Sequence, residues 1–312
     1  MATILITGGA GFIGSHVVDL CLREGRRVVV VDNLSSGRQD HVHPGARFYQ
    51  ADITDQAAME AVFQEEKPDI INHHAAHINL RRSVEDPLTD ARQNILGSLV
   101  LLELSRHYGV RRFIFASTGG AMYGEPVTLP VEETAEAHPL SPYGVAKRSV
   151  ELYLDSYRLN WGLEAVILRY GNVYGPRQEA GGEAGVVAIF SKRILFGRPC
   201  TIYGDGRQTR DYVFVGDVAR ANLLALYGPP GTYNIGTGQE TSVLDLVEML
   251  GRASSRQVSV VHASSRPGET ARIALSAHRS KAVLRWAPAT TLPEGIALTW
   301  QWFLENDNRH CF

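Results

Sequence analysis

An apolar run of five residues that leads directly into a glycine-rich turn is the feature that most limits how this chain can fold. Residues 3–7 (Thr-Ile-Leu-Ile-Thr) have the β-branched, uncharged composition of a buried parallel strand. Glycines follow at positions 8, 9, 11 and 14, and a helical pattern extends from about Phe12 to Glu24. Such a turn lets the backbone approach a pyrophosphate and directs a helix N-terminus at it. The segment therefore predicts a dinucleotide-binding unit.

A carboxylate at the end of the second predicted strand indicates which dinucleotide is bound. The strand runs from Arg27 to Val31, and Asp32 follows it. A carboxylate at this place accepts hydrogen bonds from the ribose hydroxyls and repels a 2′-phosphate. The next residues, Asn33 and Leu34, supply no cation that could neutralise such a phosphate. We therefore expect NAD rather than NADP.

Strands and helices continue to alternate along the chain. Further strands are predicted at about 47–50, 69–73, 111–116 and 164–169, and long helices at about 87–108 and 143–160. This alternation favours an α/β fold with a doubly wound parallel (Rossmann) sheet. We expect residues 1–168 to form the NAD-binding domain, with 211–246 returning to it. We expect 169–210 and 247–312 to form a smaller α/β substrate-binding domain.

A tyrosine and a lysine four residues apart begin the helix predicted at 143–160. Tyr143 and Lys147 would share one helix face, one turn apart. A free tyrosine has a pKa of about 10, so a base that works near pH 7 needs roughly 4 kcal/mol of help. One cation at about 5 Å, with an effective dielectric constant of about 20, supplies roughly 3 kcal/mol. An oxidised nicotinamide, itself cationic, would supply the rest. The pair predicts proton chemistry beside the cofactor.

Composition excludes several classes of partner. The 312 residues carry a net charge of −2, which gives no reason to expect nucleic acid or an anionic membrane surface. No stretch approaches the roughly 20 apolar residues of a membrane span, and the first residues enter a strand at once. The three cysteines are odd in number and widely spaced. We therefore expect a cytoplasmic protein without a disulfide framework.

Three histidines near the strand at 69–73 raise the question of a metal site. His73, His74 and His77 lie at the strand end and its loop, where Ala75 and Ala76 are small enough to let a cofactor pass. No cysteine or nearby acid completes a ligand shell, so we expect no metal. Asn94, inside a predicted helix, could bond toward the active site or face solvent.

Basic and aromatic residues recur together in the second half of the chain. They are Tyr203, Arg207, Arg210, Tyr212 and Arg266. Such side chains suit a diphosphate joined to a base that can stack. A solvated charge pattern explains Arg207 equally well. Arg210 abuts a predicted strand, which favours a binding role there.

Seven motifs in order resemble the extended short-chain dehydrogenase/reductase family, and most closely its UDP-glucose 4-epimerase branch. Together they span nearly the whole chain. They are TGGAGFIGSH at 7–16, VVDNLSSG at 30–37, STGGAMYGE at 117–125, SPYGVAK at 141–147, RYGNVYGPRQ at 169–178, GDGRQTRDYVFVGDV at 204–218 and RPGE at 266–269.

The resemblance implies a catalytic cycle without net oxidation. Tyr143 would remove the proton of the sugar 4-hydroxyl while NAD takes the hydride from C4. Lys147 would be the electrostatic partner of Tyr143 and a ribose ligand. The 4-keto sugar would then turn over and take the hydride back on its other face. Thr118 would bind the sugar O4, with Ser117 as the alternative, because two glycines follow them where many epimerases have a third hydroxyl residue.

The resemblance also implies two sets of contacts. The NAD contacts would be Gly8, Gly11, Phe12, Ile13, Gly14, Asp32, Asn33, Asp52, Ile53, Ala75, Ala76, His77, Asn94, Ser117, Tyr143, Lys147 and Tyr170. The UDP-sugar contacts would be Thr118, Tyr143, Asn172, Val187, Thr201, Tyr203, Arg210, Tyr212, Arg266, Glu269 and Ile273.

The choice of sugar stays open at this point. In the family, the position of Ile273 is thought to set how large a C2 substituent fits, and isoleucine lies between the bulky and the small residues found there. We expect UDP-glucose and UDP-galactose to be better substrates than UDP-N-acetylglucosamine. UDP-glucuronate is an alternative, with Arg81, Arg82 or Arg177 as carboxylate partners.

Other activities fit the sequence less well. A dehydratase needs an acid/base carboxylate pair where Gly119 and Gly120 stand, and glycine cannot transfer protons. A regulator that binds NAD without chemistry would not need Tyr143 and Lys147. Similar enzymes pair two long helices across a two-fold axis, so we expect a homodimer through 87–108 and 143–160.

Overall fold

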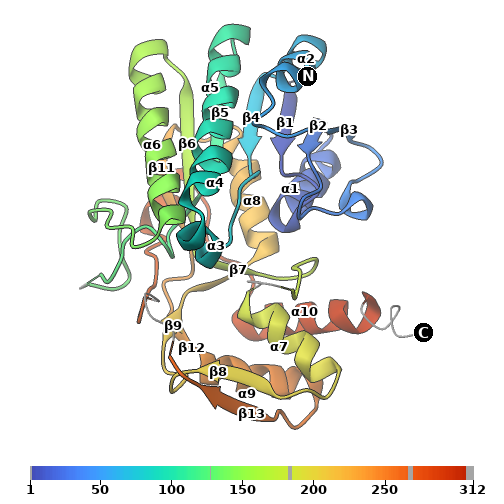
Figure 1. Cartoon of the computed structure of the whole chain (residues 1–312), viewed down its shortest axis with the longest axis vertical. Helices are drawn as coiled ribbons and strands as arrows, with labels where there is room; N and C mark the ends of the chain where they lie inside the picture. Colours follow the sequence, from blue (N-terminus) through green and yellow to red (C-terminus); the bar gives the residue numbers. More distant parts are fainter. Residues whose placement is uncertain (1, 127, 182–184, 266–269, 307–312) are drawn as a thin grey trace.

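A seven-stranded parallel sheet forms the framework of the larger unit (Figure 1). The computed structural model describes residues 2–126, 128–181, 185–265 and 270–306. The strand order is β11-β6-β5-β4-β1-β2-β3. The chain adds strands outward from β1 first on one side and then on the other, which confirms the predicted doubly wound sheet. The strands are β1 (Thr3–Thr7), β2 (Arg27–Asp32), β3 (Arg47–Gln50), β4 (Ile70–His73), β5 (Arg112–Thr118), β6 (Glu164–Tyr170) and β11 (Gly231–Ile235).

Helices cover both faces of this sheet, so its central strands are buried between two apolar cores. One face packs against α1 (Phe12–Arg23) and α8 (Val215–Ala225), and the other against α2 (Gln56–Glu66), α5 (Gly97–Tyr108) and α6 (Pro142–Trp161). Side chains alternate between the two cores along each strand. Ile4 and Ile6 enter the first core, whereas Leu5 between them enters the second.

The helix expected at 87–108 is divided by a π-helical turn. It consists of α4 (Pro87–Ala91), the π turn η2 (Arg92–Leu96) and α5. A shorter helix, α3 (Leu80–Glu85), precedes it, and Asp86 caps α4 by accepting a hydrogen bond from the Thr89 amide at 3.0 Å. Single π turns inside α-helices recur at functional sites.

A smaller unit lies beyond the carboxyl ends of the strands (Figure 1). Its core is formed mainly by apolar side chains from three helices and one strand. Its elements are α7 (Val186–Leu195), β8 (Cys200–Tyr203), β9 (Thr209–Arg210), β12 (Thr241–Ser242), α9 (Val243–Ser254), β13 (Val260–Ala263) and α10 (Leu292–Asn306), while β7 (Asn172–Tyr174) pairs with β10 (Tyr212–Phe214) near the junction.

Two chain segments belong to other units than the expected domain boundaries would give. The expected boundary at 246 falls inside α9, whose apolar face packs in the core of the smaller unit. Conversely, part of the segment expected in the smaller unit lies against the sheet. Leu284 and Trp286 join the core beside α8, where Trp286 Nε1 donates to the Asp217 carbonyl at 2.8 Å.

A buried ion pair joins α6 to the strands that end at the junction. Arg169 on β6 donates to Glu151 on α6 through Nε at 2.9 Å and through a terminal nitrogen at 2.6 Å. The Glu151 side chain is 1% exposed. Ser117, near the end of β5, donates its hydroxyl to the same carboxylate at 2.7 Å. The network therefore fixes where β5 ends relative to α6.

No helix among the described residues is long and apolar enough to cross a membrane.

Replacing Arg169 with methionine should destabilise the protein by about 3–5 kcal/mol, because it leaves the Glu151 carboxylate buried without its main partner. The Arg252→Met variant is the matched control, since it removes an exposed ion pair with Glu248 on α9. Its effect should stay within about 0.5 kcal/mol. Chemical denaturation of both variants measures the difference. Equal, small losses would show that the buried pair does not stabilise the fold.

Candidate active site

Tyr143 and Lys147 meet the end of β5 at the start of α6. Ser141 caps this helix by accepting a hydrogen bond from the Gly144 amide at 3.2 Å. The Lys147 ammonium lies 5.8 Å from the centre of the Tyr143 ring. It donates to the Ala116 carbonyl at 2.8 Å, and the residue is only 4% exposed. The lysine is thus held between the strand and the tyrosine.

The charge balance at this pair differs from the one expected from sequence. Burial raises the pKa of Tyr143 above its ordinary value of 10.0, and the nearby carboxylate of Asp90 raises it further. Burial lowers the pKa of Lys147 to about 8, against the opposing influence of Asp90 and Glu151. The lysine stays mostly charged at pH 7, but its charge does not outweigh the effect of burial on the phenol.

The structure separates the two hydroxyl residues that the sequence left as alternatives. Ser117 is buried and directs its hydroxyl into the core, toward Glu151. Thr118 is the last residue of β5 and lines the large cavity beside Tyr143. Its hydroxyl oxygen accepts from the Ala121 amide at 3.2 Å, which leaves its own O–H to donate. This placement favours Thr118 as the sugar ligand.

The glycine turn after β1 is too tight for side chains. Gly8 has a φ of +69°, and a Cβ there would lie 2.6 Å from the Ala75 amide nitrogen. A Cβ on Gly14 would lie 2.2 Å from the Gly8 carbonyl oxygen. Gly11 is the N-cap of α1, so the first amides of the helix face the turn. The turn fits the pyrophosphate of a dinucleotide.

Asp32 is oriented by backbone amides at the end of β2. Its carboxylate accepts from Ala10 at 3.0 Å and from Leu34 at 2.8 Å. A Cβ on Gly37 would come within 2.8 Å of the same carboxylate. Asn33 donates to Asp52 at 2.8 Å, which joins the ends of β2 and β3. A fixed carboxylate in this place fits the ribose diol of NAD.

The remaining residues expected near the cofactor have different surroundings in the structure. Asn94 faces inward and binds the backbone of His77 on both sides, at 2.8 Å and 2.9 Å. Tyr170 instead uses its hydroxyl within the core, where it accepts from Asn222 at 2.8 Å. Phe12 and Ile13 begin α1, Ile53 packs against Gly97, and Ala76 lies in the loop between β4 and α3.

His73 and His74 have structural roles. The imidazole of His73 is fully surrounded and hydrogen-bonds the hydroxyls of Thr7 at 2.7 Å and Ser98 at 2.9 Å. His74 stacks on Tyr170. Within the ranges that the structure describes, no group of three or more His, Cys, Asp or Glu residues could hold a metal ion.

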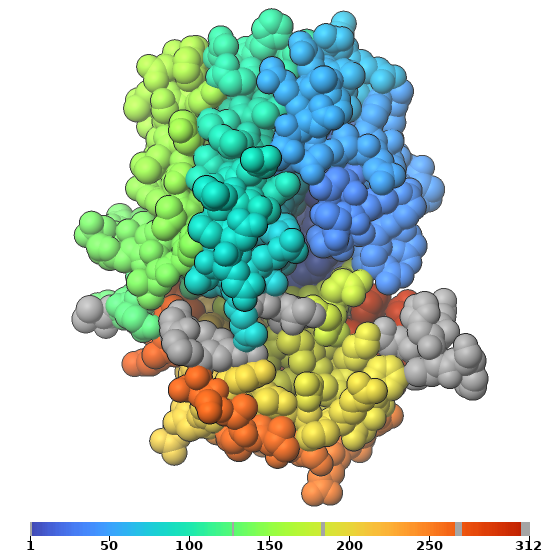
Figure 2. Space-filling model, in the orientation of Figure 1, coloured from blue at the N-terminus to red at the C-terminus, as the bar shows by residue number. Residues whose placement is uncertain are grey.

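A cavity of about 1230 Å³ lies between the two units. In Figure 2 the larger unit (blue to light green) and the smaller unit (yellow to orange) meet across the middle of the molecule. Side chains from both line the cavity, including Tyr143 and Thr118 on one side and Arg210 on the other. The other predicted substrate ligands that line it are Asn172, Thr201, Tyr203 and Tyr212.

Two predicted substrate ligands lie elsewhere. Val187 faces the core of the smaller unit, and its neighbour Val186 lines the cavity instead. Ile273 is 2% exposed and packs against Met122 and Leu275, so its side chain is not part of the described cavity wall. This placement disfavours Ile273 as the determinant of substrate size. Arg266 and Glu269 lie outside the described residues.

The cavity wall also contains basic residues that the sequence motifs did not indicate. Lys192, Arg193 and Arg198 come from α7 and the loop after it. None of the sequence motifs includes these three residues, so their place at the cavity could be seen only in the folded structure. Of the arginines considered as carboxylate partners, Arg81 lines the cavity, whereas Arg177 forms an ion pair with Asp19 on α1 at 2.7 Å.

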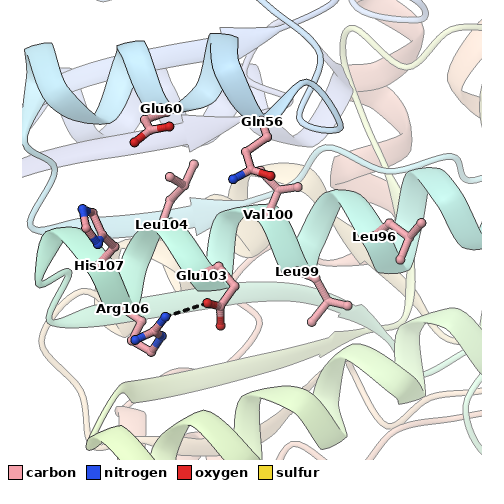
Figure 3. Close-up of a pocket in the computed structure, with 9 residues that line it drawn as sticks. All are labelled: Gln56, Glu60, Leu96, Leu99, Val100, Glu103, Leu104, Arg106 and His107. Carbon is pink, nitrogen blue, oxygen red and sulfur yellow. Dashed lines mark hydrogen bonds and ion pairs between the residues drawn. The ribbon is translucent and has the colours of Figure 1, made fainter.

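A second cavity, of about 460 Å³, lies between α2 and α5 (Figure 3). Val100 and Leu104 point from α5 toward α2, and Glu103 and Arg106, also on α5, form an ion pair. None of its lining residues belongs to the predicted site.

Comparison with known proteins gives consistent matches over nearly the whole chain. Residues 4–236 match the model of the NAD dependent epimerase/dehydratase family. The chain is 44% identical to a putative UDP-glucose 4-epimerase of Methanocaldococcus jannaschii, over 98% of this chain and 99% of that protein.

Two solved structures share the fold. The UDP-glucose 4-epimerase of Thermotoga maritima, determined with UDP-glucose, has a TM-score of 0.96 and 48% identity, covering 97% of this chain and 99% of that one. The UDP-glucose 4-epimerase of Thermus thermophilus, in complex with NAD, has a TM-score of 0.94 and 45% identity over the same shares of the two chains.

Proposed function

The chain belongs to the NAD-dependent epimerase/dehydratase family, and we propose that it interconverts UDP-glucose and UDP-galactose. One observation carries the proposal. The Tyr143 side chain lies on the wall of a cavity that extends from Thr118 to the basic residues of the smaller unit, and Lys147 lies directly behind it. Proton chemistry on a sugar and the binding of a nucleoside diphosphate can therefore occur in one cavity.

Tyr143 exchanges the proton of the sugar 4-hydroxyl in this proposal. NAD, held by the glycine turn and Asp32, would supply the hydride chemistry by taking a hydride from sugar C4 and giving it back on the opposite face of the 4-keto sugar. Thr118 binds the sugar O4, because it lines the cavity beside Tyr143 and its hydroxyl can still donate a hydrogen bond. Ser117 positions the strand end through Glu151 and does not bind the sugar.

Lys147 stabilises negative charge on the Tyr143 oxygen. Its ammonium is fixed by the Ala116 carbonyl, so it need not reorganise when that charge develops. Burial holds the pKa of Tyr143 above its ordinary value, so in the protein without cofactor and substrate the Tyr143 phenol keeps its proton at neutral pH. Ionisation of Tyr143 is therefore a property of the filled site.

The smaller unit binds the nucleotide part of the substrate. Arg210 at the end of β9 contributes positive charge for the diphosphate, and Tyr203 and Tyr212 contribute aromatic surface. Arg266 and Glu269 would complete this set. The cavity is large enough for a nucleoside diphosphate sugar, since ligand sites of this kind measure about 300–1,000 Å³.

Replacing Tyr143 with phenylalanine should lower kcat by about 10²–10⁴-fold while folding and NAD content persist, because only the ionisable oxygen is lost. Thr118→Val should also lower kcat. Ser117→Ala should keep kcat near the parental value but lower stability by about 1–3 kcal/mol, since the hydroxyl serves buried Glu151. Conversion of UDP-galactose, coupled to UDP-glucose dehydrogenase, measures all three. Near-parental turnover of the Tyr143 variant would contradict the assigned base.

We also propose that two chains associate through α5 and α6. Large apolar side chains are exposed along this side of the molecule, among them Leu96, Leu152, Leu159 and Trp161. Leu159 is 72% exposed. Exposed large apolar side chains that recur along one helix pair are typical of a protein interface.

The double variant Leu152→Glu/Leu159→Glu should be monomeric, whereas the parent should have twice the chain mass of 34.3 kDa. Leu298→Glu is the control, because Leu298 is exposed on α10 of the smaller unit. Light scattering at micromolar concentration distinguishes the two states. A parental protein that is monomeric under these conditions would refute the proposal.

A further inference from the structure

We propose that Asp90 is a positioning residue for the Tyr143–Lys147 pair, acting through its hydrogen bond to Asn94 and through its buried negative charge. The inference rests on the proposed function, since it assigns a task to a residue behind the same site. Asp90 lies in α4, which packs against α6. It contributes nothing to the cavity wall and was not indicated by any sequence motif.

Asp90 fixes the orientation of a buried amide. It is 2% exposed, and its carboxylate accepts from Asn94 Nδ2 at 2.9 Å. A carboxylate only accepts hydrogen bonds, so the NH₂ side of the Asn94 amide must face it. In that orientation the same nitrogen donates to the His77 carbonyl at 2.9 Å, and the amide oxygen accepts from the His77 N–H at 2.8 Å.

This clamp holds the loop that connects the cofactor turn to the cavity. His77 lies between β4 and α3, in the loop that includes Ala75 beside Gly8. Farther along, Ser83 on α3 accepts a hydrogen bond from the Tyr143 amide at 3.3 Å. The Asp90–Asn94–His77 contacts therefore fix the start of the segment whose later residue Ser83 contacts the backbone of Tyr143. Asn94 belongs to the π turn, a geometry that recurs at functional sites.

The charge of Asp90 acts on both members of the pair in the same direction. It raises the pKa of Lys147, which favours the ammonium, and it raises the pKa of Tyr143, which opposes the phenolate. After burial, Asp90 is thus the next influence on each group, and it favours the ammonium of Lys147 and the protonated phenol of Tyr143.

The other groups around the pair do not replace this charge. Glu151 on α6 also raises the pKa of Lys147, but it is bound by Arg169. On β4, burial keeps the pKa of His73 well below its ordinary value, and in the following loop it lowers the pKa of His74 to about 3, so both are neutral at pH 7. Burial raises the pKa of Asp90 itself, against the opposing influence of the Asn94 hydrogen bond, His77 and Lys147.

The Asp90→Asn variant tests the charge, because it keeps the size and an acceptor oxygen for Asn94. Removing the negative charge should lower both pKa values. The acidic limb of the kcat–pH profile, assigned to Tyr143, and the basic limb, assigned to Lys147, should therefore both move to lower pH. A shift on the order of one unit is expected for a charge at this depth. Asp155→Asn is the matched control, since Asp155 is exposed on α6 and its replacement should leave both limbs in place.

The Asp90→Glu variant tests position separately from charge. It keeps the carboxylate but displaces it from Asn94, so the limbs should stay near their parental pH while kcat falls several-fold. Thermal melting establishes that both variants fold. Parental pH limbs in Asp90→Asn, with only a lower melting temperature, would overturn the proposal and leave Asp90 a purely structural residue.

A spectroscopic titration keeps the test independent of turnover. The ultraviolet absorbance of tyrosinate is followed with pH in the NAD-loaded protein, and the Tyr143→Phe variant is subtracted. Asp90→Asn should move the Tyr143 component to lower pH. An unmoved component would overturn the proposal even if the protein converts no UDP-sugar. Absence of conversion with a moved component would refute the proposed substrate alone.

Discussion

A buried positive charge at the carboxyl edge of the sheet is the constraint on which the rest of the site depends. Lys147 is almost inaccessible to water, and its ammonium is held by one carbonyl and by the aromatic faces of Phe115 and Tyr143. Burying a charge is costly unless polar partners and opposite charges compensate. The strand end, the start of α6 and the acid on α4 together provide that compensation.

The fold explains how those partners are brought together. Because β5 and β6 are adjacent and parallel, Ser117 and Arg169 lie side by side and both reach Glu151 on α6. This contact sets the depth of α6 against the sheet, and with it the place of Tyr143. The glycine turn after β1 lies near the same edge, so the cofactor cradle and the proton-transfer group share one end of the sheet.

Much of this arrangement could be predicted from sequence, because it depends on local patterns. The glycine spacing, Asp32 after the second strand, and Tyr143 four residues before Lys147 each specify a local geometry. Whether Ser117 or Thr118 binds the sugar could not be predicted. It depends on which hydroxyl donates to Glu151, a residue 34 positions away from Ser117 in the sequence. The inward packing of Ile273 likewise follows from its contacts with Met122 and Leu275.

Electrostatics was the least predictable part. Counting one cation beside Tyr143 suggested an easily ionised phenol, whereas burial and Asp90 raise its pKa. In the proposed cycle, the hydride that leaves C4 of the sugar returns to the same carbon without exchange with water. UDP-galactose that carries deuterium at C4, incubated with the protein in ordinary water, tests it most directly. Retention of the deuterium at C4 of the product UDP-glucose is the predicted result, and its loss to solvent would contradict the account.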